Sequence, residues 1–211
     1  MTDARRVLAL VLVGASAVWA ALGHHSPAPE PAGPLTEDVR AAGLRFDPSV
    51  APLDRQAVTD AIAAARPEAR RLVEVVDGLV IIGVADTGAG AVGVTQQTAV
   101  GYTVTLDLAD VSGANGARGI SRLVLHELGH VIDSALVPDD VVATLDAGIP
   151  KGWECDGGHS GACAAVPERF AESFAKWATG DIGVDLHIGY RVPPPGPTLD
   201  AWGEPLARLG A

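Results

Sequence analysis

Two histidines and a glutamate stand close together in the chain: Glu127 directly follows His126, and His130 comes three residues later. On an α-helix successive residues turn by about 100°, so the two histidines lie on one face, one turn apart, with Glu127 beside them. Two imidazoles placed in this way can share one metal ion, and a neighbouring carboxylate can take a proton from water. The spacing predicts a zinc site with Glu127 as the catalytic base.

The neighbouring residues predict the helix that this spacing needs. We expect it from about Ala117 to Leu136, between a loop over 112–116 that contains Gly and Asn and a stop at Pro138. Its apolar side chains lie opposite the histidines, which separates a packing face from a polar face directed to a cleft. These apolar residues are Val124, Leu128, Val131 and Ala135.

A catalytic zinc ion needs a third protein ligand. A third histidine ten residues after the first is excluded, because Leu136 occupies that position. Asp133 shares the histidine face but lies a further turn along, so it suits a supporting contact better than ligation. The predicted helix 167–179 is a better source, because Glu168 and Glu172 are four residues apart. One of them can bind the metal while the other accepts the free N–H of a ligating histidine, although such a pair also suits a solvated surface.

These two segments resemble the Glu-zincin peptidases, and within them the domain shared by anthrax lethal factor and the Pro-Pro endopeptidases. The resemblance rests on HELGHVID, which begins at His126, and on ERFAE, which begins at Glu168, and it spans about residues 117–179. It implies a zincin-like α+β fold, with a small twisted sheet packed on the active-site helix and a second helix bearing a ligand. It also implies that Glu168 is the third zinc ligand and Glu172 its supporting companion.

One position departs from the pattern of that family. The family carries a tyrosine seven residues before the ligand glutamate, where it stabilises the oxyanion, and this chain has Gly161 there. The side chains considered for that role are Tyr102, His159, His187 and Tyr190. The departure indicates either a replacement donor or lost activity.

The expected reaction is hydrolysis of a peptide bond in a protein or peptide substrate. Water activated at a zinc site of His126, His130 and Glu168 loses a proton to Glu127, which passes it to the leaving amine. The segment 93–95 is a candidate strand for pairing with an extended substrate. Two alternatives stay open: an exported binding or toxin-like module that keeps zinc for its shape, and an amidase acting on cell-wall material.

The remaining periodicity predicts the α+β domain that carries these helices. Segment 72–76 stays open between a helix end and a strand, because the Asp77-Gly78 pair is typical of a hairpin turn. Gly129 is expected to permit close approach of a neighbouring segment. Strands of one sheet are expected at 79–84, 91–95 and 102–108. Further helices are expected at 54–65, 138–145 and 199–209.

The N-terminal residues predict export. Two arginines precede an apolar run that is short for a membrane span, so residues 1–23 are expected to be a signal peptide or, if uncleaved, a membrane anchor. The proline-rich segment 24–34 is expected to be an extended linker, and 35–211 the catalytic domain. The protein is therefore expected outside the cytoplasm.

The two cysteines, Cys155 and Cys163, fall in a Gly-rich segment over 148–166. A closely spaced pair in an exported protein favours a local disulfide, and a second metal site with His159 is the alternative.

Composition limits the partners. Of the 211 residues 48% are apolar, enough for one domain with a sizeable core, and the net charge is −11. Nucleic acid is excluded as an expected partner, because binding phosphates needs clustered Lys and Arg.

Overall fold

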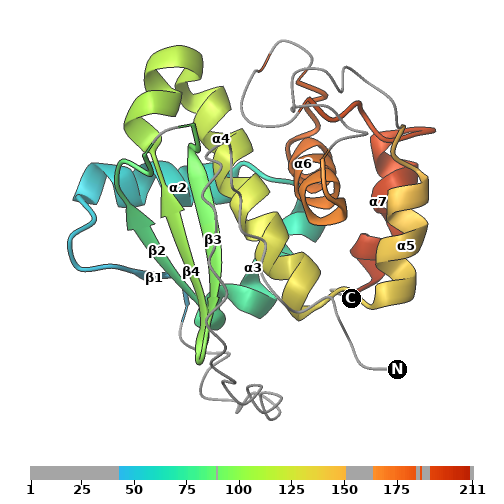
Figure 1. Cartoon of the computed structure of the whole chain (residues 1–211), viewed down its shortest axis with the longest axis horizontal. Helices are drawn as coiled ribbons and strands as arrows, with labels where there is room; N and C mark the ends of the chain where they lie inside the picture. The colour runs from blue at the N-terminus through green and yellow to red at the C-terminus, as the bar shows by residue number, and fades with distance from the viewer. Residues whose placement is uncertain (1–42, 89, 151–163, 184–185, 187–190, 210–211) are drawn as a thin grey trace, which may run out of the picture.

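The computed structural model describes residues 43–88, 90–150, 164–183, 186 and 191–209, which form a four-stranded mixed sheet and six α-helices (Figure 1). This architecture confirms the predicted α+β class. The predicted signal or anchor, the predicted linker and the cysteine pair Cys155 and Cys163 lie outside the described residues. In the part of the chain that is described, no helix has both the length and the apolar character needed to cross a membrane.

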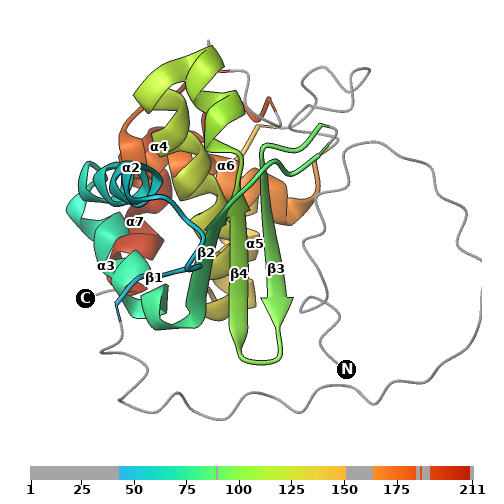
Figure 2. The ribbon, with the colours of Figure 1, turned by 90° about the vertical axis from the view of Figure 1, so that its left-hand side faces the viewer.

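The sheet has the strand order β1-β2-β4-β3, so β3 lies at one edge (Figure 2). Strands β1, β2 and β4 run parallel, whereas β3 is antiparallel to β4 and forms a hairpin with it. Alternate residues of β4 are buried, which places one face of the sheet against the helices. The strands are β1 (Arg45–Phe46), β2 (Val80–Val84), β3 (Gly93–Thr98) and β4 (Gly101–Leu106).

All three strand predictions needed correction at their ends, and the strand expected over 79–84 begins at Val80 because Leu79 belongs to a 3-10 turn. The strand expected over 91–95 begins at Gly93 and continues to Thr98, because it pairs with β4 over its whole length. The strand expected over 102–108 ends at Leu106, because the Asp107 side chain accepts a hydrogen bond from Asp110 N at 3.0 Å and so caps the following helix.

Two helices begin with proline, which suits a first turn where no N–H is needed. Segment 72–76, left open by the sequence, is the end of α3. Asp77–Leu79 then forms a 3-10 turn that leads into β2 rather than a hairpin. The helices are α2 (Pro52–Ala63), α3 (Pro67–Val76), α4 (Leu108–Ala135), α5 (Asp139–Ala147), α6 (Val166–Thr179) and α7 (Leu199–Leu209).

The prediction of a loop over 112–116 is wrong for all but its last residue. Helix α4 already begins at Leu108, and within it only Gly116 leaves helical geometry, with φ 61° and ψ −153°. Buried Leu108 and Val111 hold the first turns against the core, which overrides the low helix propensity of the Gly and Asn residues that follow. At the other end Ala135 is exposed, so the predicted apolar face of α4 ends one turn earlier, at Val131.

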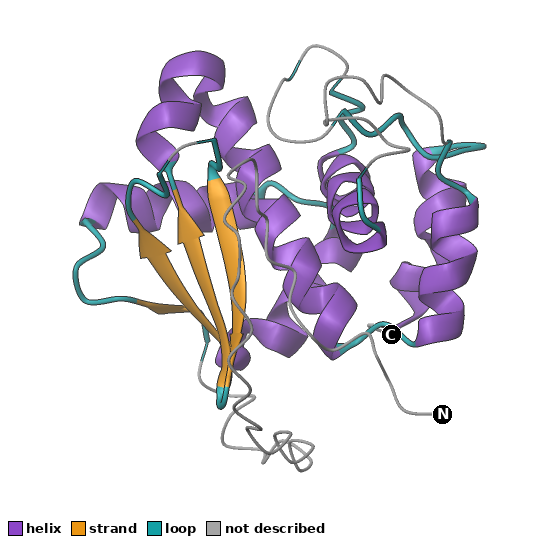
Figure 3. Ribbon diagram, in the orientation of Figure 1, coloured by secondary structure: helices purple, strands orange, loops and turns teal. Residues whose placement is uncertain are grey.

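Helix α4 is the centre of the molecule. It contacts β3 and β4 on one side and α6 on the other, and α5, α6 and α7 lie across α4 from the strands (Figure 3). Its residues from Leu123 to Leu125, together with Leu128 and Ile132, belong to the buried core. The two histidines predicted to face a cleft contact α6 instead.

Candidate metal centre

Helix α4 carries three polar residues at intervals of four: Arg122, His126 and His130. This spacing places them in one row along the helix. All three are buried, and His130 has only 1% of its surface exposed. A row of polar side chains inside the protein must find polar partners on the facing element.

The facing element, α6, carries the matching row: Glu168, Glu172 and Lys176, again at intervals of four. Its other face holds Phe170 and Phe174 in the apolar core, which fixes the rotation of the helix. The helix ends at Gly180, which adopts the left-handed conformation with φ 69°. The contacts between the rows run in opposite chain directions, so α4 and α6 are antiparallel here: His130 meets Glu168, and Arg122 meets Glu172.

Gly129 allows the two helices to approach closely, as the sequence predicted. A Cβ atom at this position would lie 3.1 Å from Ala171 Cα and 3.2 Å from Phe174 Cδ1. The main chain of α6 thus packs closely on α4 at Gly129, which helps to bring the side chains of the two histidines and Glu168 together.

We expect Gly129→Val to destabilise the fold by about 1–3 kcal/mol, because the added carbons press on the backbone of α6. Urea unfolding followed by circular dichroism measures this change. Gly113→Val is the control, since Gly113 lies in the same helix and a Cβ atom added there would have no neighbouring atom within 4 Å. Equal stabilities of the two variants would contradict the close contact.

His126, His130 and Glu168 form a buried group whose potential ligand atoms all lie within 4.8 Å of one another. Glu168 Oε2 is 3.3 Å from His126 Nε2, and Glu168 Oε1 is 3.5 Å from His130 Nε2. Two ligand atoms on one tetrahedral zinc ion, each at about 2.0–2.2 Å, lie roughly 3.3–3.6 Å apart. The spacing of the three side chains therefore fits a single metal ion.

Unsatisfied polar atoms support the same fit. His130 Nε2 is buried and has no hydrogen-bond partner within the described part of the chain, and Glu168 Oε2 has the ion-pair contact with His126 Nε2 at 3.3 Å but no hydrogen bond there. Leaving such atoms unpaired in the interior is unfavourable, and a bound cation would satisfy both. Two imidazole nitrogens and one carboxylate oxygen are a donor set suited to zinc and to related divalent ions.

Glu172 contacts the other nitrogen of His126. Its Oε2 atom is 3.2 Å from His126 Nδ1. A carboxylate can only accept, so Nδ1 carries the proton and Nε2 faces Glu168 and the proposed ion. The geometry places Glu168 in the group that could hold a metal and Glu172 beside His126, and the ligand and supporting roles implied by the family resemblance stay predictions.

Glu127 lies on the side of α4 that faces the edge strand β3. The Thr95 hydroxyl is 2.7 Å from Glu127 Oε2 and 3.1 Å from the main-chain oxygen of the same residue. A Cβ atom on Gly93 would lie 2.3 Å from Glu127 Oε1, so the missing side chain at position 93 makes room for the carboxylate. Strand β3 therefore positions the proposed base.

The buried charges shift one another's protonation. Burial alone lowers the pKa of His126, but its close contacts with the carboxylates of Glu168 and Glu172 outweigh burial and raise it to about 10. Burial raises the pKa of Glu172, but Lys176, the His126 bond and Arg122 together lower it to about 2. Burial likewise opposes ionisation of Glu168, yet the two histidines hold its pKa well below the usual range. The two neighbouring carboxylates therefore favour the protonated form of His126.

This protonation predicts how zinc binding responds to pH. Zinc needs neutral imidazole, and the pKa of His126 in the metal-free protein is raised from 6.5 to about 10, so binding near neutral pH must release that proton. Apparent zinc affinity should rise about tenfold per pH unit between about pH 7 and pH 9. Calorimetry in buffers of different ionisation enthalpy should detect about one proton released per zinc. A pH-independent affinity over this range would contradict the His126 assignment.

Other predicted site residues stand apart from this group. Asp133 lies beyond His130 on α4 and is half-buried; its supporting role stays a prediction. Tyr102 is buried in the core at the start of β4, and its oxyanion role is likewise untested. The remaining candidates for that role, and the position of the departure, lie outside the described residues: His159, Gly161, His187 and Tyr190.

Three contacts of the site were not predicted: Thr95 as a partner of Glu127, and Arg122 and Lys176 as partners of Glu172. The spacing of four residues from Arg122 to His126 and from Glu172 to Lys176 is a signal that could have indicated the last two. No comparable signal exists for Thr95, because its contact depends on which strand lies beside α4.

The fold and the site together define an α+β protein with a buried His-His-Glu group able to hold a metal ion. No known protein family, curated protein or solved structure gives a significant match to the chain.

Proposed function

We propose that the protein is a zinc-dependent endopeptidase with a zincin-like fold. The observation that carries the proposal is the convergence of His126, His130 and Glu168 at metal-ligand spacing, with Glu127 next to His126 on α4. The edge strand β3 adds support, because it lies beside the active-site helix and is antiparallel to the rest of the sheet.

In this proposal His126, His130 and Glu168 hold the ion. A zinc ion bound there supplies Lewis acidity, which polarises a carbonyl and lowers the pKa of water. Glu127 removes a proton from the attacking water and delivers it to the leaving amine nitrogen as the peptide bond breaks. Thr95 keeps the Glu127 side chain beside β3 by donating its hydroxyl proton to the carboxylate.

The edge of the sheet offers a docking position for an extended substrate. In the described sheet β3 pairs with β4 on one side only. A peptide that adds to the other edge would form main-chain hydrogen bonds and run past Glu127. We therefore propose a protein or peptide substrate bound in extended form. The predicted signal segment, residues 1–23, supports a location outside the cytoplasm.

A non-catalytic zinc-containing module is the second candidate, and Gly161 at the position of the family's tyrosine favours it. Two measurements on the full chain separate the candidates: zinc content and cleavage of a peptide library. The peptidase should hold one zinc per chain, cut peptides, lose activity to a chelator and regain it with zinc. One zinc per chain without any cleavage would instead support the second candidate, and absence of zinc would contradict both.

A further inference from the structure

The two carboxylate oxygens of Glu172 face different groups. Oε2 accepts from His126 Nδ1 at 3.2 Å. Oε1 accepts from Lys176 Nζ at 2.5 Å and lies 3.7 Å from Arg122 Nε. Glu172 thus connects a proposed metal ligand to two cations on its far side.

Both cations are deep inside the protein. Lys176 has 3% of its surface exposed and Arg122 has 2%. Buried cations that lack a partner are strongly unfavourable, so their positions need a compensating anion. Burial lowers the pKa of Lys176, and the Glu172 carboxylate is the main group that opposes this change.

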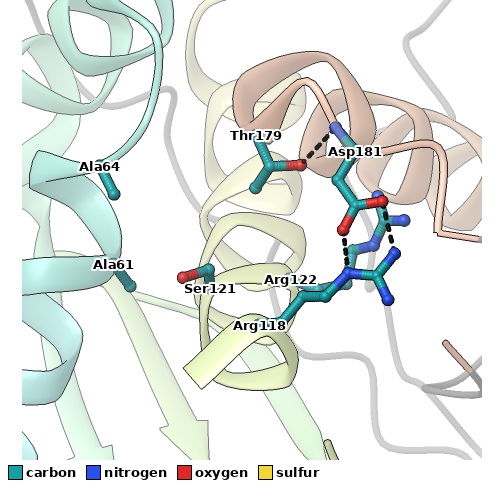
Figure 4. A pocket seen from close by; sticks show the side chains of 7 residues that line it. All are labelled: Ala61, Ala64, Arg118, Ser121, Arg122, Thr179 and Asp181. Carbon is teal, nitrogen blue, oxygen red and sulfur yellow. Dashed lines mark hydrogen bonds and ion pairs between the residues drawn. The ribbon is translucent and has the colours of Figure 1, made fainter. Parts of the chain in front are cut away.

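On the outer side of Arg122 lies Asp181, whose charge interacts with Arg122 but whose oxygens already accept from other groups. Figure 4 shows Asp181 paired with Arg118 next to the Arg122 side chain. The carboxylate of Asp181 accepts from Arg118 through both oxygens and from Gly183 N at 2.8 Å. None of the guanidinium nitrogens of Arg122 has a hydrogen-bond partner among the described residues, which leaves Glu172 as its ion-pair partner.

The chain following α6 also packs directly on Arg122. A Cβ atom at Gly183 would lie 1.7 Å from Arg122 Nη2, and Gly183 has a φ of 58°. The absence of a side chain there lets the main chain cover the guanidinium and keep it turned toward α6. A cavity of about 200 Å³ borders this region between α2, α4 and the end of α6, and its polar groups include the paired Arg118 and Asp181.

We propose that Lys176 and Arg122 are positioning residues of the metal centre: together they orient Glu172 on His126 Nδ1 and so present Nε2 of that histidine to the metal. This inference rests on the proposed zinc site. Lys176 makes the shorter contact and sets the direction of Oε1, and Arg122 adds a second positive charge at the same oxygen. Without them Glu172 would be a buried carboxylate whose remaining partner among the described residues is His126.

The test compares Lys176→Met, which keeps the length of the side chain without its charge, with Lys176→Arg, which keeps the charge. Zinc affinity of the full chain is measured by competition with a chromophoric chelator. Lys176→Met should weaken zinc binding by about tenfold or more, since loss of outer partners of a metal ligand typically has effects of about 10–100-fold. Lys176→Arg should recover most of this loss.

A spectroscopic signature separates positioning from general loosening of α6. In the zinc-loaded protein, NMR observes the proton on His126 Nδ1, which should move upfield and exchange faster in Lys176→Met. Arg66→Met is the control, because Arg66 stacks on Trp177 of α6 at 4.9 Å and pairs with Asp200 rather than with Glu172. It should leave the Nδ1 proton and the zinc affinity unchanged.

If Lys176→Met does not fold, Arg122→Gln provides the same comparison from α4. If a folded variant keeps the zinc affinity and the Nδ1 proton signal of the wild type, this inference is overturned. The proposed zinc site would still stand. Absence of zinc from the wild-type protein would overturn both the proposed function and this inference.

Discussion

Replacing Glu127 with glutamine should abolish peptide hydrolysis while zinc stays bound. The amide has nearly the same shape as the carboxylate and can still accept the Thr95 hydroxyl, which lies 2.7 Å from Oε2 of the glutamate. It cannot take a proton from water, and loss of a general base typically reduces the rate by about 10²–10⁴-fold. The turnover of a quenched fluorescent peptide and the zinc content of the same sample measure the two parts of this expectation.

The burial of Glu127 makes this variant a sharp test. The side chain is 2% exposed and is not one of the three ligand residues, so the substitution changes neither the surface nor the ligand set. Glu74→Gln is the matched control, because it makes the same chemical change at an exposed position of α3. Undiminished turnover in Glu127→Gln would contradict its role as base, and lost zinc would show that the substitution disturbs the ligands.

The two helices of the site could be predicted because their signals are local. Helix α6 is expected from Pro167 and observed from Val166, since a proline in the first turn and Gly180 after the last turn define its ends. The intervals of four residues then place the predicted ligands in rows, and the structure brings these rows together. The start of α4 could not be predicted in this way, because burial of Leu108 and Val111 is a tertiary effect.

The partners of the site residues depend on long-range structure. Thr95 meets Glu127 only because the chain orders its strands β1-β2-β4-β3 and so places β3 beside α4. Lys176 has the spacing of a partner for Glu172, but a lysine on a helix usually points to solvent, and sequence alone does not show that both are buried.

Replacing Glu168 with glutamine should have the largest effect on metal binding. The carboxylate oxygens of Glu168 lie 3.3 Å from His126 Nε2 and 3.5 Å from His130 Nε2. This carboxylate would therefore contact a bound ion directly. We expect zinc affinity to fall by more than about 100-fold, beyond the range of about 10–100-fold that is typical of outer partners. Chelator competition with Glu168→Gln and Glu172→Gln side by side makes the comparison.

The comparison decides which glutamate is the ligand, because the two carboxylates are one turn apart and both contact His126. Glu172 is neutralised by Lys176 and Arg122 on its other side, so little of its charge is available to an ion. Glu168 instead faces the two histidines, and its Oε2 has no hydrogen-bond partner in the described part of the chain. A larger loss of zinc affinity in Glu172→Gln than in Glu168→Gln would reverse the assignment and place the ion on the other side of His126.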